Sequence, residues 1–312
     1  MVREYCHAVL IPVIFSRLKQ TQHFLCWVFL SVFFSALIGC SFTPRGYANQ
    51  IASQKEWQSI KFSSGDFVLH GFHGDFSSKE NTLVVYIGGD GHAWKNRWTP
   101  STDPTPWNPV ALRLAVQTPE PKVLFLGRPC QFTTHETRTG CHPKYWTSHR
   151  YSQEVIDALD EALDQAKVLA RTEKIILAGY SGGGVLVALL SAQRDDVTHF
   201  VTIAANLDLD AWAKEQGISP LSGSLNPADF AVKLKDIPQT HLVGEKDFIV
   251  SPAILQSYLL KLHKPLITQW VVIPNYDHQC CWVDSWQELY VKYLMIQTPK
   301  QIHHPSLVSD QK

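Results

Sequence analysis

The stretch IILAGYSGGGVLVALLSA, residues 175–192, decides the fold of this chain. An apolar run typical of a buried strand ends in Gly-Tyr-Ser-Gly-Gly-Gly, and an apolar run typical of a buried helix follows it. Residues 179–183 fit the pattern G-x-S-x-G, in which small neighbours allow a sharp turn to lift a serine hydroxyl above the sheet. Ser181 is therefore the predicted nucleophile. The alternative is a glycine-rich turn in which Ser181 only caps the helix.

Strand-like and helix-like runs alternate along the rest of the chain. Two strand-like runs around residues 63–66 predict an antiparallel hairpin. The later strands, at 83–87, 123–126, 174–180, 198–208, 238–247 and 268–275, are nearly continuous Val, Ile and Leu runs. Helices are expected at 108–117, after Ser152, after Ser181, at 252–262 and at 282–296. This pattern predicts an α/β fold with a mostly parallel sheet, covered by helices on both faces.

A serine nucleophile needs a base and an orienting carboxylate, because its hydroxyl is weakly nucleophilic at neutral pH. His278 follows the last strand, and Asp247 follows the strand before it. The chain order Ser181, Asp247, His278 is the order expected of an α/β-hydrolase, so these three residues form the predicted catalytic triad. Glu245 and Asp277 are the rival candidates for the acid.

An oxyanion hole is expected next to the nucleophile, and backbone N–H groups supply it. The N–H of Gly182, at the predicted start of a helix, is one expected donor. The second is expected from the glycine-rich turn at residues 88–91, through Gly89 or Asp90. The alternative is a plain glycine turn that bends the chain after its strand.

The N-terminus differs in kind from the rest. Residues 24–40, FLCWVFLSVFFSALIGC, carry no charge and follow a basic flank, as in an export signal. The run is shorter than the roughly 20 residues that span a bilayer. Its end at residues 37–40 resembles the bacterial lipoprotein cleavage box, which implies that Cys40 becomes the first mature residue and carries lipid. The alternative is an uncleaved membrane anchor.

These features divide the chain into a signal peptide at 1–39, a tether at 40–54, a hydrolase domain at 55–297 and a flexible tail at 298–312. Four cysteines remain in the domain, and an even count in an exported protein favours disulfides. The favoured pairing joins Cys130 to Cys141 and Cys280 to Cys281. No metal is expected, because the cysteines lack a zinc-site spacing with histidine.

Composition excludes one class of partner. The 312 residues are 45% hydrophobic and 18% charged, with a formal net charge of zero, so the chain lacks the basic character of a nucleic-acid binder. The sequence resembles the α/β-hydrolase superfamily over most of residues 67–296, and it resembles a group of bacterial exported or lipoprotein hydrolases in segments such as IGGDGHAW, GYSGGG and DHQCCW. The resemblance implies a Ser–Asp–His hydrolase and no particular substrate.

The predicted function is an exported serine hydrolase that cleaves an acyl bond, an ester or thioester first, through an acyl-enzyme and without a cofactor. Its substrate is a small or lipid-like acyl compound. Arg128, Trp146, His149 and Arg150 are candidates to line the mouth of the site and bind an anionic group, although such residues more often pack loops together. The expected location is the bacterial envelope, lipid-anchored on the periplasmic side of the outer membrane, or otherwise periplasmic or secreted. An acyltransferase and a non-catalytic envelope binding lipoprotein are the alternative functions.

Overall fold

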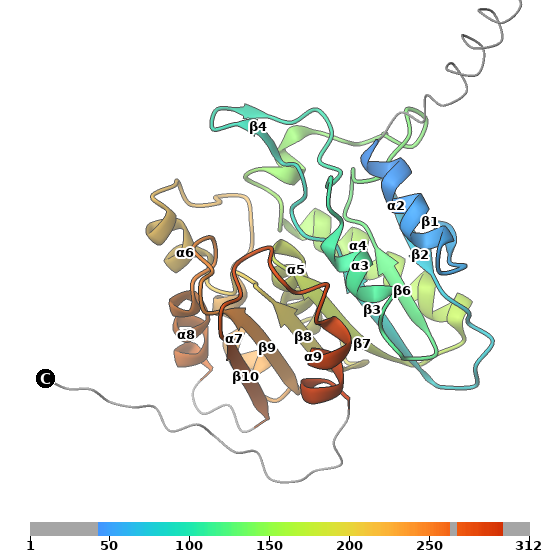
Figure 1. Cartoon of the computed structure of the whole chain (residues 1–312). Coiled ribbons are helices and arrows are strands. Elements are labelled where there is room, and N and C mark those ends of the chain that lie inside the picture. The colour runs from blue at the N-terminus through green and yellow to red at the C-terminus, as the bar shows by residue number, and fades with distance from the viewer. Residues whose placement is uncertain (1–42, 263–266, 296–312) are drawn as a thin grey trace, which may run out of the picture. The chain divides into compact units, whose positions relative to one another are not determined.

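The computed structural model describes residues 43–262 and 267–295, so the predicted signal peptide, Cys40 and the tail at 298–312 lie outside the described residues. The described chain is built on an eight-stranded sheet in the order β1-β2-β6-β3-β7-β8-β9-β10 (Figure 1). Its strands are β1 (Gln58–Ser64), β2 (Phe67–His73), β3 (Thr82–Ile87), β6 (Val123–Leu126), β7 (Lys174–Tyr180), β8 (Val197–Ile203), β9 (Gln239–Gly244) and β10 (Thr268–Ile273).

Strand direction divides the sheet into two parts. β1 and β2 form the predicted antiparallel hairpin, and β2 also pairs antiparallel with β6. All neighbouring pairs from β6 to β10 are parallel. The carboxyl ends of these strands therefore meet at one edge of the sheet, where open α/β sheets place their ligands. The predicted mostly parallel sheet is confirmed.

Helices cover both faces of the sheet. The α-helices are α2 (Pro44–Ser53), α3 (Val110–Ala115), α4 (Gln153–Ala170), α5 (Gly182–Ser191), α6 (Leu209–Gln216), α7 (Ala231–Leu234), α8 (Pro252–Lys261) and α9 (Trp286–Tyr293). One hydrophobic cluster joins α4, α5, α7 and α8 to the sheet, and a second joins α2, α3 and α9 to it.

Strand β3 shows why the strand sequences are continuously apolar. Leu83, Val85 and Ile87 belong to the first cluster, whereas Val84 and Tyr86 belong to the second. Successive side chains of a strand point to opposite faces, so a strand covered on both sides needs apolar residues at every position. All five side chains are at most 3% exposed.

Several elements differ from the sequence prediction, and α6 and α7 are among those that it did not include. The predicted tether at 40–54 is wrong over residues 44–53, which form α2 with Ala48 and Ala52 buried in the second cluster. Thr43 caps this helix, because its side chain accepts a hydrogen bond from the N–H of Gly46 at 3.0 Å. A small hairpin of β4 (Trp94–Asn96) and β5 (Thr99–Pro100) was not predicted.

Candidate active site

Ser181 lies at the turn between β7 and α5. Its backbone has φ 53° and ψ −124°, a left-handed conformation that is unfavourable for a residue with a side chain. The neighbouring glycines are required by close packing, because a Cβ on Gly179 would lie 2.3 Å from the carbonyl carbon of Gly183. The N–H of Ser181 donates to Ile203 O at 2.8 Å and ties the turn to β8. The predicted strand–turn–helix elbow is present.

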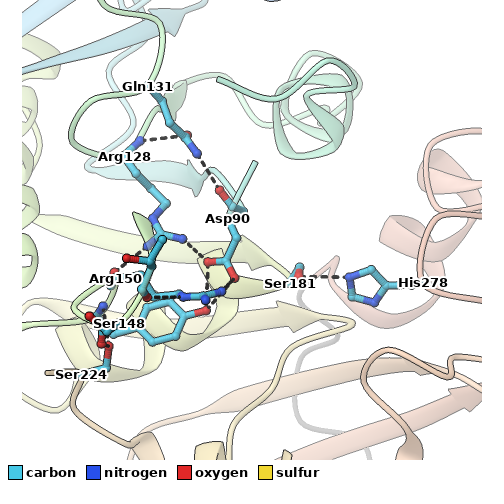
Figure 2. A network of polar contacts seen from close by, with 11 residues as sticks. Asp90, Arg128, Gln131, Ser148, Arg150, Ser181, Ser224 and His278 are labelled. Carbon is cyan, nitrogen blue, oxygen red and sulfur yellow. Dashed lines mark hydrogen bonds and ion pairs between the residues drawn. The ribbon is translucent and has the colours of Figure 1, made fainter. Parts of the chain in front are cut away.

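The imidazole of His278 lies between Ser181 and Asp247. His278 Nε2 is 3.0 Å from Ser181 Oγ, the contact drawn in Figure 2, and His278 Nδ1 is 2.8 Å from Asp247 Oδ2. The other carboxylate oxygen of Asp247 accepts the N–H groups of Ile249 and Val250 at 2.9 and 2.8 Å. Three side chains predicted from separate strand ends thus meet in one hydrogen-bonded chain.

The rival acids bind backbone groups elsewhere. Glu245 Oε2 accepts the N–H of Asn275 at 3.0 Å. Asp277 Oδ1 accepts the N–H groups of Gln279 and Cys280 at 2.8 and 2.7 Å, and these bonds lower the pKa of the Asp277 carboxyl. Asp247 is therefore the carboxylate with the geometry to orient the imidazole.

The loop that carries His278 is held from several sides. Tyr180, directly before the serine, donates its hydroxyl to His278 O at 2.5 Å, and Trp282 Nε1 donates to Asp277 O at 3.0 Å. Cys280 and Cys281, in the same loop, are joined by a disulfide. A second disulfide, outside this loop, joins Cys130 to Cys141. Both bonds have the predicted pairing.

The glycine-rich turn at 88–91 lies against the elbow. A Cβ on Gly89 would be 3.0 Å from Tyr180 O and 3.6 Å from Ser181 Cβ. The N–H of Gly88 is already used, since it donates to Leu126 O at 3.1 Å. The predicted donors Gly89 and Asp90 thus lie in a turn that packs against Ser181, and Gly182 is the first residue of α5.

A cavity of about 500 Å³ opens at Ser181 and His278. Its apolar wall includes Trp107, Val110 and Ile249. Its polar lining, beyond the serine and histidine, consists of residues 88–92, Asn108 and Gln279. A site of this size, with both apolar and polar lining, can hold a small molecule that is partly apolar.

None of the four residues predicted to bind an anionic substrate group lines this cavity. Trp146 is 5% exposed and donates its Nε1–H to Ser101 O at 3.1 Å, and His149 Nδ1 lies 2.8 Å from Ser148 Oγ. The guanidinium groups of Arg128 and Arg150 both bind Asp90. The predicted substrate role is wrong for these residues, which pack loops together instead.

The sequence singled out Arg128 and Arg150 but not their pairing with Asp90, and it assigned no role to Tyr151. Figure 2 shows Asp90 facing Arg128 and Arg150, and the Tyr151 hydroxyl donates to the same carboxylate at 2.9 Å. Burial alone would raise the pKa of the Asp90 carboxyl, but the two guanidinium groups hold that pKa well below its usual range. The only sequence signal was the position of Arg128 just after a buried strand.

Two features are absent from the described residues. Within residues 43–262 and 267–295, no group of three or more His, Cys, Asp or Glu residues is arranged to hold a metal ion. Over the same ranges, no helix combines the length and the apolar character needed to cross a membrane.

The fold is that of the α/β hydrolases. An esterase of Pyrococcus furiosus superposes with a TM-score of 0.54 at 15% identity, over 77% of this chain and 91% of the esterase. The protein Est1E of Butyrivibrio proteoclasticus gives 0.52 at 14% identity, over 75% and 98% of the two chains. An α/β serine hydrolase homologue of Coxiella burnetii gives 0.52 at 13% identity, over 75% and 96%. At such identities the similarity establishes the fold alone.

Sequence comparison finds no protein family whose profile matches this chain and no curated protein similar to it. The assignment of chemistry to this site therefore depends on the geometry of its own residues.

Proposed function

We propose that this protein is a serine hydrolase that cleaves ester bonds, with Ser181, His278 and Asp247 as its catalytic triad. The observation that carries the proposal is the chain of hydrogen bonds from Ser181 Oγ through the imidazole to a fixed carboxylate. A serine used only as a helix cap has no need of a histidine at 3.0 Å from its hydroxyl. Esterases among the proteins that share the fold agree with this reading.

The first half of the reaction forms the acyl-enzyme. Ser181 Oγ attacks the carbonyl carbon, His278 Nε2 takes the hydroxyl proton, and the carbonyl π electrons move onto oxygen. Asp247 accepts the Nδ1–H bond and stabilises the resulting imidazolium. The C–O bond to the leaving group then breaks as His278 returns the proton to the departing alkoxide oxygen, so that an alcohol leaves.

The second half releases the acid. A water molecule gives a proton to His278 Nε2 and its oxygen attacks the acyl carbon, after which the bond to Ser181 Oγ breaks and the serine regains its proton. In both halves the substrate carbonyl oxygen carries negative charge. The N–H of Gly182 and one N–H of the turn at 88–91 are the proposed donors to this oxygen.

The cavity favours an acyl compound with an apolar part. Trp107, Val110 and Ile249 offer apolar surface close to Ser181, and the carboxylate in the lining, Asp90, is bound by two arginines. This apolar part of the wall favours contact with a neutral acyl chain over contact with a charged one. We therefore place esters of apolar acids ahead of charged substrates.

A fluorophosphonate probe tests the nucleophile directly, because it bonds covalently to an activated serine. We expect the full chain to react and the Ser181→Ala variant to remain unlabelled. Ser222→Ala, which removes an exposed serine on a loop, is the matched control and should be labelled like the wild type. Equal labelling of wild type and Ser181→Ala would refute the assignment.

We also propose that the protein is exported and lipid-anchored in the bacterial envelope. The support is the uncharged run at residues 24–40, which ends in Gly39-Cys40. Growth with a labelled fatty acid should give a labelled protein, and Cys40→Ser should abolish that label. A full-length precursor that carries no lipid would contradict the proposal.

A further inference from the structure

Asp90 is the centre of a polar cluster directly beside the nucleophile. Its carboxylate binds Arg128 Nη1 and lies 2.7 Å from Arg150 Nη1, and it also accepts the Tyr151 hydroxyl. The two arginine side chains are only 3% and 8% exposed, whereas that of Asp90 is 22% exposed and lines the cavity. Two buried guanidinium groups held by one carboxylate are costly to build, so the arrangement calls for an explanation.

Sheet order explains how the cluster reaches the site. Arg128 follows β6, Asp90 follows β3 and Ser181 follows β7, and these three strands are consecutive in the sheet. The carboxylate also packs against the residue after the nucleophile, because a Cβ on Gly182 would lie 2.1 Å from Asp90 Oδ1. Asp90 thus connects the glycine-rich turn to the first residue of α5.

A neutral contact fixes the orientation of the turn. Gln131 Nε2 donates to Gly89 O at 2.9 Å, and Gln131 Oε1 accepts the Arg128 N–H at 3.3 Å. The carbonyl of Gly89 and the N–H of Asp90 belong to one peptide group, and in a trans peptide they point in opposite directions. Gln131 belongs to the loop after β6, so we infer that the Gly89 carbonyl faces the β6 side and that the Asp90 N–H faces the side where β7 carries Ser181.

The cluster carries an excess of positive charge. Its bonded groups comprise two guanidinium groups and one carboxylate, and arginine stays protonated in proteins. The cluster also lies at the N-terminus of α5, where the helix dipole is already positive. This combination suits a negative charge that forms at Ser181 during reaction, as an oxyanion does.

We propose that Asp90, Arg128, Arg150 and Gln131 form a positioning unit that holds the Asp90 N–H as the second oxyanion donor, with a net positive charge behind it. This inference rests on the proposed function. It selects Asp90 over Gly89 as the donor. It also gives the two arginines a role in stabilising the transition state through the turn, without contact with the substrate.

The test compares Asp90→Asn with Arg194→Gln in the full chain. Arg194 lies beyond the other end of α5 in a second arginine–aspartate cluster, so its substitution is a matched control. With p-nitrophenyl acetate as the probe ester, we expect Asp90→Asn to lower kcat by about 10²-fold and to leave KM nearly unchanged. The reason is that a displaced N–H donor no longer stabilises the oxyanion, whose charge develops only in the transition state. Arg194→Gln should leave both constants unchanged.

A second readout separates positioning from general damage to the fold. An aryl trifluoromethyl ketone adds to Ser181 and forms an oxyanion in the same place as the reaction does, so its affinity should fall in parallel with kcat in Asp90→Asn. A fall in kcat without loss of ketone affinity would overturn the inference, as would wild-type kcat. If Asp90→Asn does not fold, Gln131→Met, which removes a neutral contact to Gly89, must show the same parallel loss.

The inference and the proposed function fail in different ways. If Ser181→Ala keeps wild-type turnover, the proposed triad is wrong, and the comparison of Asp90→Asn with Arg194→Gln no longer tests an oxyanion donor. If Ser181→Ala is inactive while Asp90→Asn and Gln131→Met both turn over and bind the ketone like the wild type, only the positioning unit is refuted.

Discussion

Helix α5 (Gly182–Ser191) has a cluster of arginine and aspartate side chains at each end, and the two clusters differ in charge and in exposure. At the N-terminal end, Arg128 and Arg150 share the single carboxylate of Asp90. Beyond the C-terminal end, Arg194 binds Asp160, Asp164 and Asp196, and Lys167 binds Asp196 as well. The first cluster has more cations than carboxylates, and the second has more carboxylates than cations.

The helix dipole gives this difference a meaning. At the negative C-terminus of α5 the Arg194 cation is favourable and the excess of carboxylates around it is not, so the contribution of this cluster to stability comes from its ion pairs. Excess positive charge at the N-terminus is unfavourable for the helix. We infer that the C-terminal cluster serves stability, whereas the N-terminal cluster gives up stability for the charge that develops at Ser181.

The largest expected effect is on kcat, and it distinguishes the N-terminal end of α5 from its C-terminal end. Ser181→Ala should lower kcat by on the order of 10⁶, the loss measured for the nucleophile of another serine hydrolase. Arg194→Gln, 13 positions along the chain, should retain full turnover of p-nitrophenyl acetate. Steady-state kinetics of the two purified variants checks this prediction, and a clear loss of turnover in Arg194→Gln would remove the distinction between the clusters.

The next effect concerns the contact between the N-terminal cluster and the elbow. Gly182→Ala would bring a methyl group to 2.1 Å from Asp90 Oδ1 and 2.6 Å from the Tyr151 hydroxyl. The Asp90 carboxylate and the Tyr151 hydroxyl are both held by hydrogen bonds and cannot easily move away from this methyl group. We therefore expect the turn at 88–91 to shift and kcat to fall by about 10²-fold. The control is Ala192→Gly, at the C-terminal side of α5. Gly217→Ala is unsuitable as a control, because the backbone of Gly217 has a positive φ that alanine adopts poorly. Wild-type kcat in Gly182→Ala would show that the carboxylate can move freely.

Sequence patterns predicted the fold and the meeting of Ser181, Asp247 and His278 because both depend on position along the chain. Continuous apolar runs mark strands that are buried on both faces, and Asp247 and His278 each follow such a strand. The arginines failed as predictions because their direction is set by a partner 38 or 60 residues away in sequence, at Asp90. No local pattern encodes that pairing.

The predicted tether failed for a different reason. Thr43 followed by Pro44 is a local signal for the start of a helix, with a capping side chain and a proline in the first turn. The segment is otherwise mostly polar, so its sequence has little apolar periodicity to support that signal. Only packing against the sheet, through Ala48 and Ala52, explains why this short helix is stable.

A further effect is expected on stability, where the loss of a buried arginine should cost more than the loss of an arginine with exposed partners. Arg194 is 8% exposed, but two of its partners are 39% and 64% exposed, so solvent screens much of the interaction. Arg194→Gln should lower the free energy of unfolding by about 1 kcal/mol. Arg150→Gln should lower it by about 3–5 kcal/mol, since one partner of a buried ion pair is removed. Urea denaturation of both variants measures the difference, and equal losses would contradict the contrast in burial.

The smallest effect is the pH dependence of the C-terminal cluster. Burial would raise the pKa of Asp196, but its bonds to Arg194 and Lys167 outweigh burial and lower that pKa below its ordinary value. A carboxyl whose pKa is lower in the folded state stabilises the fold above its unfolded pKa of about 3.9. This stabilisation is lost as the pH falls through the folded value. The stability difference between wild type and Arg194→Gln should therefore stay constant from neutral pH down to about pH 5 and shrink below about pH 4. Urea midpoints measured across this range test it, and a difference that is unchanged well below pH 4 would mean that the cluster contributes through packing and not through charge.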